Sequence, residues 1–428
     1  MIIKNFRDLA IDNNRRVVLK ILESGLASAM PDSMIQKFVR KNQIIINKSA
    51  KSLSKYASIF IIAFGKAADS MTNEVNSLTC IKGGIVVIPE GYVSVLKTKK
   101  FEIIHAGHPI PNKNSMKAAN KIIKFLKDRN ENDLVIFLIS GGGSSLVSLP
   151  DGITLDEKRI ATNLLIKCGA SINEINCVRK HLSQIKGGRI LEHLKCDAIS
   201  LVMSDVIGND ISSIASGTAY FDKTTFRDAE KVFKKYNLLQ SVPSNVLTRI
   251  RLGIKKKIAE TPKRQKIKNQ IVATNKNCLD VMKKTSRNLG LTTKTVYPIS
   301  GDVKQIAKTL AKLIMKAKTN SCIIFGGETT VRVKGKGKGG RNQELVLYIL
   351  DEVKKAKQTI TVTSIGTDGK DGNTDACGAM LNNKVSFNDV KKFLQNNNSN
   401  FFLKKYNGLV FTGPTHTNLM DIGVLLKR

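Results

Sequence analysis

The sequence contains no tryptophan, and aromatic residues make up only 5% of its 428 positions. Few aromatic side chains leave few platforms on which nucleic-acid bases can stack. Seven cysteines stand singly, without a Cys-x-x-Cys pair, and only five histidines are present. These counts exclude a disulfide framework and argue against a zinc centre. They favour reduced thiols in a cytoplasmic protein.

The sequence also shows no pattern typical of a membrane-spanning helix or a secretory signal. No apolar run approaches the roughly 20 residues that a membrane span needs. Residues 1–16 carry too many charges for a secretory signal. With 42% hydrophobic residues, the chain is long enough for two or three globular domains. We expect a cytoplasmic protein without a membrane partner, as a monomer or a homodimer.

Acidic residues are scarce, because 34 Asp and Glu stand against 70 Lys and Arg, for a net charge of +36. Such an excess raises the possibility of nucleic-acid binding. The excess is mostly lysine, however, and it is spread over the whole length on what we interpret as solvated surfaces. Nucleic-acid binding is therefore an alternative that we do not expect.

Apolar runs typical of buried strands alternate with helical patterns, which predicts α/β domains with mainly parallel sheets. The expected strands span 58–64, 84–88, 133–139, 198–203, 269–274, 292–298, 321–325, 330–334 and 359–365. The clearest expected helices span 113–128, 155–168, 225–236, 275–289 and 303–317. The basic run 249–268 interrupts this order, so we expect a domain boundary there.

Small and polar residues follow the ends of several expected strands. In open α/β sheets, ligands bind beyond the carboxyl ends of the strands. Lys66 follows the strand 58–64 and opens a helix, where its ammonium can attract an anion. The strand 133–139 is followed by bare amides and hydroxyls suited to a phosphate or a carboxylate, namely Ser140, Gly141, Gly142, Gly143 and Ser144. A plain strand-to-helix turn is the alternative at each single end.

Two further segments carry cations beside glycines. Arg341 lies in the glycine-rich run 333–344, where its planar guanidinium suits a phosphate or a carboxylate. The segment 172–189 has an apolar stripe at helical spacing and a separate polar, cationic stripe. That polar stripe carries Asn176, Arg179, Lys180 and Lys186. It suits an acidic substrate, and a basic surface helix is the alternative interpretation.

Aspartates beside glycines complete the pattern. Asp205 and Asp210 stand in SDVIGND, and Asp368 and Asp371 stand in GTDGKDG. Such aspartates often bind Mg²⁺ together with substrate phosphates, although they also serve as turn residues. An anion loop, a lysine, an arginine and sparse carboxylates are the parts that phosphoryl transfer uses. Asp205 and Asp368 are the candidate metal ligands.

Six segments in order resemble the blocks of class II glycerate kinases: LISGGGSSL, INEINCVRKHLSQIKGGR, SDVIGNDISSIASG, GGETTVRVKGKGKGGRNQE, GTDGKDGNTDACGA and GPTHTNLMD. The resemblance implies ATP-dependent phosphorylation of D-glycerate, usually to 2-phosphoglycerate, with Mg²⁺ or another divalent cation. It implies two α/β domains with an active-site cleft between them. The first would be a Rossmann-like domain over 1–250. The second would be a smaller domain over 265–428, with its last residues able to pack back on the first.

The resemblance also implies roles for particular residues. It places the catalytic lysine at Lys66 and the catalytic arginine at Arg341. Phosphate or substrate binding is expected of Ser140, Gly141, Gly142, Gly143, Ser144, Asn176, Arg179, Lys180, Lys186, Asp205, Asp210 and Glu328. Which anion the serine and glycine turn holds is left open. Thr218 stands where the family tends to have proline, and His416 stands where it tends to have glycine.

An NAD(P)H-dependent hydroxypyruvate reductase is the other enzyme class to weigh, because relatives of this family carry that name. A reductase normally shows G-x-G-x-x-G after an early strand. Here the early strand runs into AFGKAA, which lacks that fingerprint. We therefore expect a kinase.

Overall fold

The computed structural model describes residues 1–385 and 389–428, which form two compact units. Unit 1 comprises Met1–Met34 together with Ala273–Arg428, and unit 2 comprises Ile35–Val272. Each unit contains its own sheet and its own hydrophobic core. No helix in the described part of the chain is both long and apolar enough to cross a membrane.

Unit 2 is built on a six-stranded sheet in the order β6-β5-β4-β7-β8-β9. Its strands are β4 (Ser58–Phe64), β5 (Gly83–Pro89), β6 (Phe101–Ala106), β7 (Asp133–Ile139), β8 (Asp197–Met203) and β9 (Lys268–Ala273). The four neighbouring pairs from β6 to β8 are parallel. Every residue of β5 and β7 is buried, which explains their continuous apolar sequences.

Helices cover this sheet and form a second, smaller core beside it. They are α4 (Ala68–Leu78), α5 (Lys113–Lys127), α6 (Gly143–Leu146), α7 (Leu155–Lys167), α8 (Ile172–His181), η1 (Arg189–His193), η2 (Ile214–Gly217), α9 (Phe226–Lys235) and α10 (Ser244–Ile254). The short helix α3 (Pro31–Ile35) begins in unit 1 and ends at the first residue of unit 2. Capping boxes begin α5, α7, α8 and α9. A separate antiparallel sheet joins β1 (Val39–Arg40), β2 (Gln43–Ile46) and β3 (Ser49–Ser52).

Unit 1 contains a mixed sheet in the order β10-β11-β15-β12-β13-β14. Its strands are β10 (Thr292–Asp302), β11 (Ser321–Thr330), β12 (Ile360–Gly366), β13 (Gly378–Asn382), β14 (Leu409–Val410) and β15 (Asp421–Lys427). Only the pair β10–β11 is parallel among the described residues. The last strand of the chain, β15, lies between β11 and β12, so it completes this sheet from inside.

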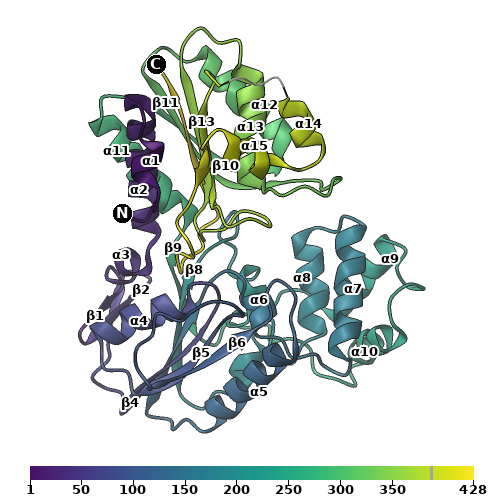
Figure 1. Cartoon of the computed structure of the whole chain (residues 1–428). Helices are drawn as coiled ribbons and strands as arrows, with labels where there is room; N and C mark the ends of the chain where they lie inside the picture. Colours follow the sequence, from purple (N-terminus) through teal and green to yellow (C-terminus); the bar gives the residue numbers. More distant parts are fainter. Residues whose placement is uncertain (386–388) are drawn as a thin grey trace. The chain divides into compact units, whose positions relative to one another are not determined.

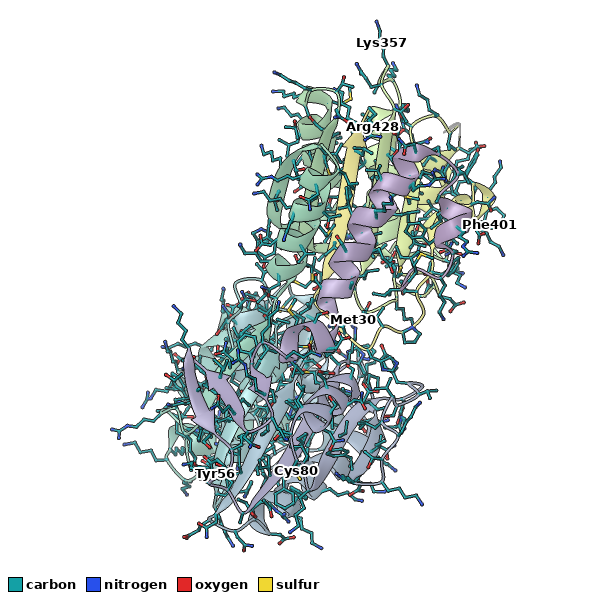
Figure 2. All side chains as sticks on the ribbon, turned by 90° about the vertical axis from the view of Figure 1, so that its left-hand side faces the viewer. Met30, Tyr56, Cys80, Lys357, Phe401 and Arg428 are labelled. Carbon is teal, nitrogen blue, oxygen red and sulfur yellow. The ribbon has the colours of Figure 1, made fainter. Side chains whose placement is uncertain are left out.

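Helices pack on both faces of the unit 1 sheet (Figure 1). They are α1 (Phe6–Leu9), α2 (Asn13–Ala29), α11 (Asn275–Asn288), α12 (Val303–Lys316), α13 (Arg341–Val353), α14 (Val390–Gln395) and α15 (Ser399–Lys405). One face carries α2 and α11, and Gly25 of α2 lies against Met282 and Ile422. Figure 2, in which Met30 marks the end of α2, shows this helix lying across the strands.

The α/β class is confirmed, and the predicted strands and helices listed above recur closely, with two corrections. The predicted strand 330–334 is wrong, because residues 331–334 have no strand structure. The amide of Lys334, and that of Gly335 after it, donate to the side chain of Asn397 instead. The predicted strand end at 325 is also wrong, because β11 continues to Thr330. Gly326 allows this continuation, since a Cβ there would lie 2.1 Å from Oδ1 of Asn275.

The two units also divide the chain differently from the expected domains. Residues 1–34 belong with unit 1, although we expected them in the first domain. The physical reason is α2, which buries an apolar stripe on the unit 1 sheet and α11. The C-terminal residues form β15 within their own unit.

We predict that Leu22→Ala destabilises unit 1. Leu22 is fully buried in α2, and truncating such a side chain costs about 2–5 kcal/mol. Urea denaturation should show the loss, and hydrogen exchange should show faster exchange of the β15 amides. Lys20→Ala, on the exposed side of the same helix, is the control. Equal stability of the two variants would contradict the packing of α2 on this sheet.

Candidate active site

The turns after β4 and β7 of unit 2 are hydrogen-bonded to each other. The amide of Lys66 donates to the carbonyl of Gly141 at 2.9 Å, and the amide of Ala67 donates to Oγ of Ser140 at 3.0 Å. The side chain of Lys66 thereby lies beside Gly142, with its Cγ 3.5 Å from where a Cβ of Gly142 would be. The structure therefore brings Lys66 and the serine and glycine turn together, as the sequence predicts.

Gly142 is needed at this corner because of its conformation and its neighbour. Its φ of +87° lies in the left-handed region, and it forms the N-cap of α6. A Cβ here would lie 2.9 Å from Cδ2 and 3.0 Å from Nε2 of His108. His108 belongs to the segment GHPIPN, and our residue predictions did not include it. It lies at the same corner as Lys66.

A row of polar side chains continues from this turn. Oγ of Ser144 lies 2.8 Å from Oγ of Ser216, which donates to Oδ1 of Asn176 at 3.0 Å. Asn176 is 3% exposed, and its Nδ2 has no hydrogen-bond partner among the described residues. A buried donor without an acceptor costs about 1–3 kcal/mol. This amide is therefore suited to bind an acceptor on a ligand.

Ser216 is held in an unusual backbone conformation. It and Ala215 have φ values of 56° and 49°, in the left-handed region that side chains disfavour. Such residues cost about 1–3 kcal/mol each and persist only where the surroundings hold them. Here the ammonium of Lys186 holds the carbonyl of Ala215, and the amide of Gly187 donates to the carbonyl of Ser216 at 3.2 Å.

Lys186 joins the two turns that carry Ser144 and Ser216. Its Nζ donates to the carbonyls of Gly143 and Ala215, both at 3.2 Å, and to Oγ1 of Thr218 at 3.0 Å. Only 2% of the residue is exposed. Burial, followed by the positive charges of Lys158 and Arg179, holds the pKa of Lys186 well below its usual value. Its ammonium is thus occupied in building the site.

Lys186 lies beyond the end of α8, and the cations nearby, Lys180 and Arg179 of α8 and Lys158 of α7, have different surroundings. Lys180 forms a buried ion pair with Asp222, with 3.3 Å between Nζ and Oδ1. Arg179 is half-buried, and burial lowers its pKa. Lys158 of α7 is 8% exposed, and our residue predictions missed it. Burial, and then the charge of Arg179, lowers the pKa of Lys158 to about 7, against the weaker effect of Asp151.

Asp210 is a turn residue in the structure. Its carboxylate accepts from the amide of Ser212 at 3.0 Å and from the hydroxyls of Ser212 and Ser213 at 2.7 and 2.8 Å. Burial raises the pKa of Asp210, but these hydrogen bonds together outweigh burial and leave the pKa below its usual value. Asp205 follows β8 and is half-buried.

In unit 1, Arg341 begins α13 and is held by two carboxylates. Its Nε and Nη2 donate to Oδ2 and Oδ1 of Asp421 at 2.6 and 3.0 Å, and its Nη1 donates to Glu328. Burial raises the pKa of Asp421 to about 6, against the opposing charge of Arg341. We did not predict Asp421, although it ends the segment GPTHTNLMD. A bidentate pair fixes the plane of the guanidinium.

The two aspartates of GTDGKDG have separate surroundings. Asp371 accepts from the amides of Asn342 and Gln343 at 3.1 and 2.9 Å, and also from both side-chain amides. It therefore caps the N-terminus of α13. Asp368 is half-buried, and its Oδ1 lies 3.1 Å from where a Cβ of Gly366 would be. Oδ1 of Asp421 lies 3.5 Å from the same point.

The two candidate metal ligands do not lie in one unit. Asp205 belongs to unit 2 and Asp368 to unit 1. Within residues 1–385 and 389–428, no three side chains of His, Cys, Asp or Glu form a group that could hold a metal ion. A cation bound at either aspartate would also need oxygen ligands from a phosphate of the bound substrate or nucleotide, which is common for Mg²⁺.

We predict that Lys158→Met increases stability most near neutral pH. The folded-state pKa of Lys158, about 7, lies below the value of 10.5 for an exposed lysine. Between these values the unfolded state binds more protons, so the stability of the wild type rises with pH. The advantage of the variant in unfolding free energy should therefore fall by about 1.4 kcal/mol per pH unit from pH 7.5 to 10. Urea denaturation at several pH values measures this difference in unfolding free energy, and the control is Lys167→Met, at an exposed position. A constant difference would contradict the prediction.

Family models match most of the chain. Residues 17–251 match a domain described as a domain of unknown function, DUF4147, and residues 321–421 match the MOFRL family. A glycerate 2-kinase of Pyrococcus horikoshii is 34% identical, with 96% of this chain and 97% of that protein covered. A D-glycerate 2-kinase of Thermotoga maritima is 34% identical, with 95% and 97% covered.

Other similar proteins include one of a different name and one of known structure. A putative hydroxypyruvate reductase of Agrobacterium vitis is 32% identical over 96% of this chain and 94% of its own. The crystal structure of a glycerate kinase from Thermotoga maritima superimposes with a TM-score of 0.82 and 34% identity, covering 96% of this chain and 99% of that one. The chain belongs to the class II glycerate 2-kinase family.

Proposed function

We infer that this protein transfers a phosphoryl group from ATP to the 2-hydroxyl of D-glycerate, giving 2-phosphoglycerate and ADP. The observation that carries the inference is that unit 2 holds Lys66 at the serine and glycine turn and unit 1 holds Arg341 between two carboxylates. These groups stand in a chain that is similar over nearly its whole length to proteins named glycerate 2-kinase. The seven free cysteines favour a reducing compartment such as the cytoplasm.

We propose that the turn Ser140–Ser145 of unit 2, with Asn176 and Lys66, binds the small anionic substrate. Hydroxyls and a neutral amide can orient a carboxylate and a hydroxyl of glycerate, and Lys66 supplies the charge. Arg179 and Lys158 stand nearby and make the potential positive. Lys186 acts as a positioning residue, because its three hydrogen bonds stay within the protein.

In unit 1 we propose that Arg341 stabilises the transferring phosphoryl group. Phosphoryl transfer depends on positioning and on stabilising negative charge in the transition state. Burial lowers the pKa of Arg341, but Asp421 and Glu328 outweigh it and raise the pKa above its usual value. The guanidinium therefore stays charged in a fixed orientation.

A divalent cation fits unit 1 best at Asp368. Its Oδ1 and that of Asp421 lie beside the same glycine, and Asp368 is half-buried whereas Asp421 is 2% exposed and orients Arg341. One carboxylate plus nucleotide oxygens is a common arrangement for Mg²⁺. When bound, such an ion neutralises negative charge on the phosphates. Asp205 is the candidate ligand from unit 2.

The reductase alternative rests on the names of some relatives. A dinucleotide site of the usual kind needs free backbone amides in a glycine-rich turn after an early strand. The run 335–340 formally contains G-x-G-x-x-G, but the amides of Gly335, Gly337 and Gly339 all donate within the protein. Binding of NADH without binding of ATP would favour the reductase.

The test is to incubate the protein with Mg-ATP and D-glycerate and to follow phosphorus by NMR. We expect the phosphomonoester signal of 2-phosphoglycerate. A signal of 3-phosphoglycerate would support the kinase activity but overturn the proposed transfer to the 2-hydroxyl. Intact ATP in the presence of folded protein and D-glycerate would overturn the proposed function.

In the same assay, Lys66→Ala and Arg341→Ala should each lower kcat about 100-fold or more, because each removes a charge from the reacting groups. Circular dichroism should show that both variants fold. Lys99→Ala and Arg287→Ala, at exposed positions of the corresponding units, should keep normal turnover. A folded variant of Lys66 or Arg341 with near-normal kcat would sink that assignment.

A further inference from the structure

The connection from β11 to α13 contains four cations on alternate residues: Arg332, Lys334, Lys336 and Lys338. We call residues 332–338 the lysine arm. All four side chains are exposed, and none forms an ion pair within the described residues. The sequence has no acidic residue between Glu328 and Glu344 to offset them. Unpaired like charges repel one another, so this arrangement favours an anionic partner.

The backbone of the lysine arm is fixed by a run of asparagines, 396–398, between α14 and α15. Oδ1 of Asn397 accepts from the amides of Lys334 and Gly335 at 2.7 and 3.0 Å. Asn396 and Asn398 bind the next three amides, with the bonds Lys336 N to Asn396 Oδ1 at 3.2 Å, Gly337 N to Asn396 O at 3.0 Å and Lys338 N to Asn398 Oδ1 at 3.2 Å. The backbone amides thus face the protein, and they do not form an anion-binding loop.

The glycines of the arm explain why its lysines point outward. A Cβ at Gly335 or Gly337 would lie 2.3 or 2.5 Å from the carbonyl oxygen of Asn396, so these two positions must approach the asparagines closely. Glycine on the inner positions and lysine on the outer positions leaves an exposed row of ammonium groups. Figure 1 shows this connection as an extended loop on the side of unit 1 where α14 and α15 lie.

The arm is also tied to the helix that carries Arg341. Asn397 is 8% exposed, and its Nδ2 donates to Oε1 of Glu344 at 2.9 Å in the first turn of α13. Nδ2 of Asn400 donates to Oε1 of Gln343 at 3.1 Å. The position of the arm's backbone relative to the start of α13 is therefore set before any ligand binds. Such preorganisation lowers the entropic cost of binding.

We propose that the lysine arm binds the phosphate chain of ATP through its ammonium groups. This rests on the proposed function, and it names the segment that recognises the nucleotide. Lysine binds phosphate as a point charge, and several lysines in a row suit a chain of phosphates. D-Glycerate carries a single carboxylate, which does not need four cations. The arm ends three residues before Arg341, the residue proposed to act on the transferred group.

The test removes the three ammonium groups in the variant K334S/K336S/K338S. We expect the KM for ATP to rise at least 10-fold, with kcat within about threefold and the KM for D-glycerate unchanged. The matched control is K304S/K308S/K312S, which removes three exposed lysines from one face of α12 in the same unit. The variant K334R/K336R/K338R keeps the charges and should retain ATP affinity.

Binding of a non-hydrolysable ATP analogue, measured by calorimetry, separates this proposal from the proposed function. Weaker binding by the serine variant than by its control supports the arm, even if the wild type transfers no phosphate to D-glycerate. Equal binding by both triple variants would overturn the arm while leaving a kinase intact. Unchanged ATP binding with reduced retention on immobilised RNA would overturn it in favour of a nucleic-acid surface. A raised KM for D-glycerate alone would also overturn it.

Discussion

The candidate site of unit 2 depends on one buried ammonium, that of Lys186. It binds the carbonyls of Gly143 and Ala215 and thereby ties the turn of Ser144 to the turn of Ser216. A hydrophobic side chain of similar length would remove these bonds, each worth about 1.5–3 kcal/mol for a charged donor. The carbonyl of Gly143 would keep the amide of Val147 at 3.3 Å, and that of Ala215 the hydroxyl of Thr218 at 2.7 Å, so the two turns would no longer be linked through this side chain. The left-handed conformation of Ser216 persists because its neighbour is held in this way. Lys186 thus serves the site without facing the ligand.

In unit 1, carboxylates and side-chain amides position the candidate functional groups, as Lys186 does in unit 2. Asp371 caps α13, Asp421 orients Arg341, and Asn397 joins the lysine arm to the same helix. In each case a buried polar side chain makes its hydrogen bonds inside the protein and thereby fixes the position of a cationic segment or side chain. Two features of this unit result: the oriented guanidinium of Arg341 and the exposed cations of the lysine arm.

The sequence predicted the strands, most helices and the clustering of Lys66 with Ser140–Ser144, because strand periodicity and glycine-rich turns are local signals. It did not predict which groups would be internal. Lys186 and Asp371 have the same sequence signature as ligand-binding residues, and only tertiary packing shows that their hydrogen bonds are already used. Lys158 and Asp421 were missed because each meets its neighbours across distant segments. The strand predicted at 330–334 failed for the same reason, since asparagines some 60 residues later bind the amide of its last residue, Lys334, and that of Lys336 just beyond it.

The two departures from the family pattern have a local explanation in the structure. Thr218, in place of proline, donates from its hydroxyl to the carbonyl of Ala215 at 2.7 Å and accepts from Lys186. The hydroxyl thus adds a polar contact to the group of hydrogen bonds around Lys186. A proline at this position would instead restrict the backbone through its ring. His416, in place of glycine, has a φ of 53°, a conformation that glycine adopts at little cost. A histidine adopts this conformation at a higher energy than glycine would, and neither change removes Lys66, Arg341 or the carboxylates that hold Arg341. The chemistry proposed here therefore rests on groups that both departures leave in place.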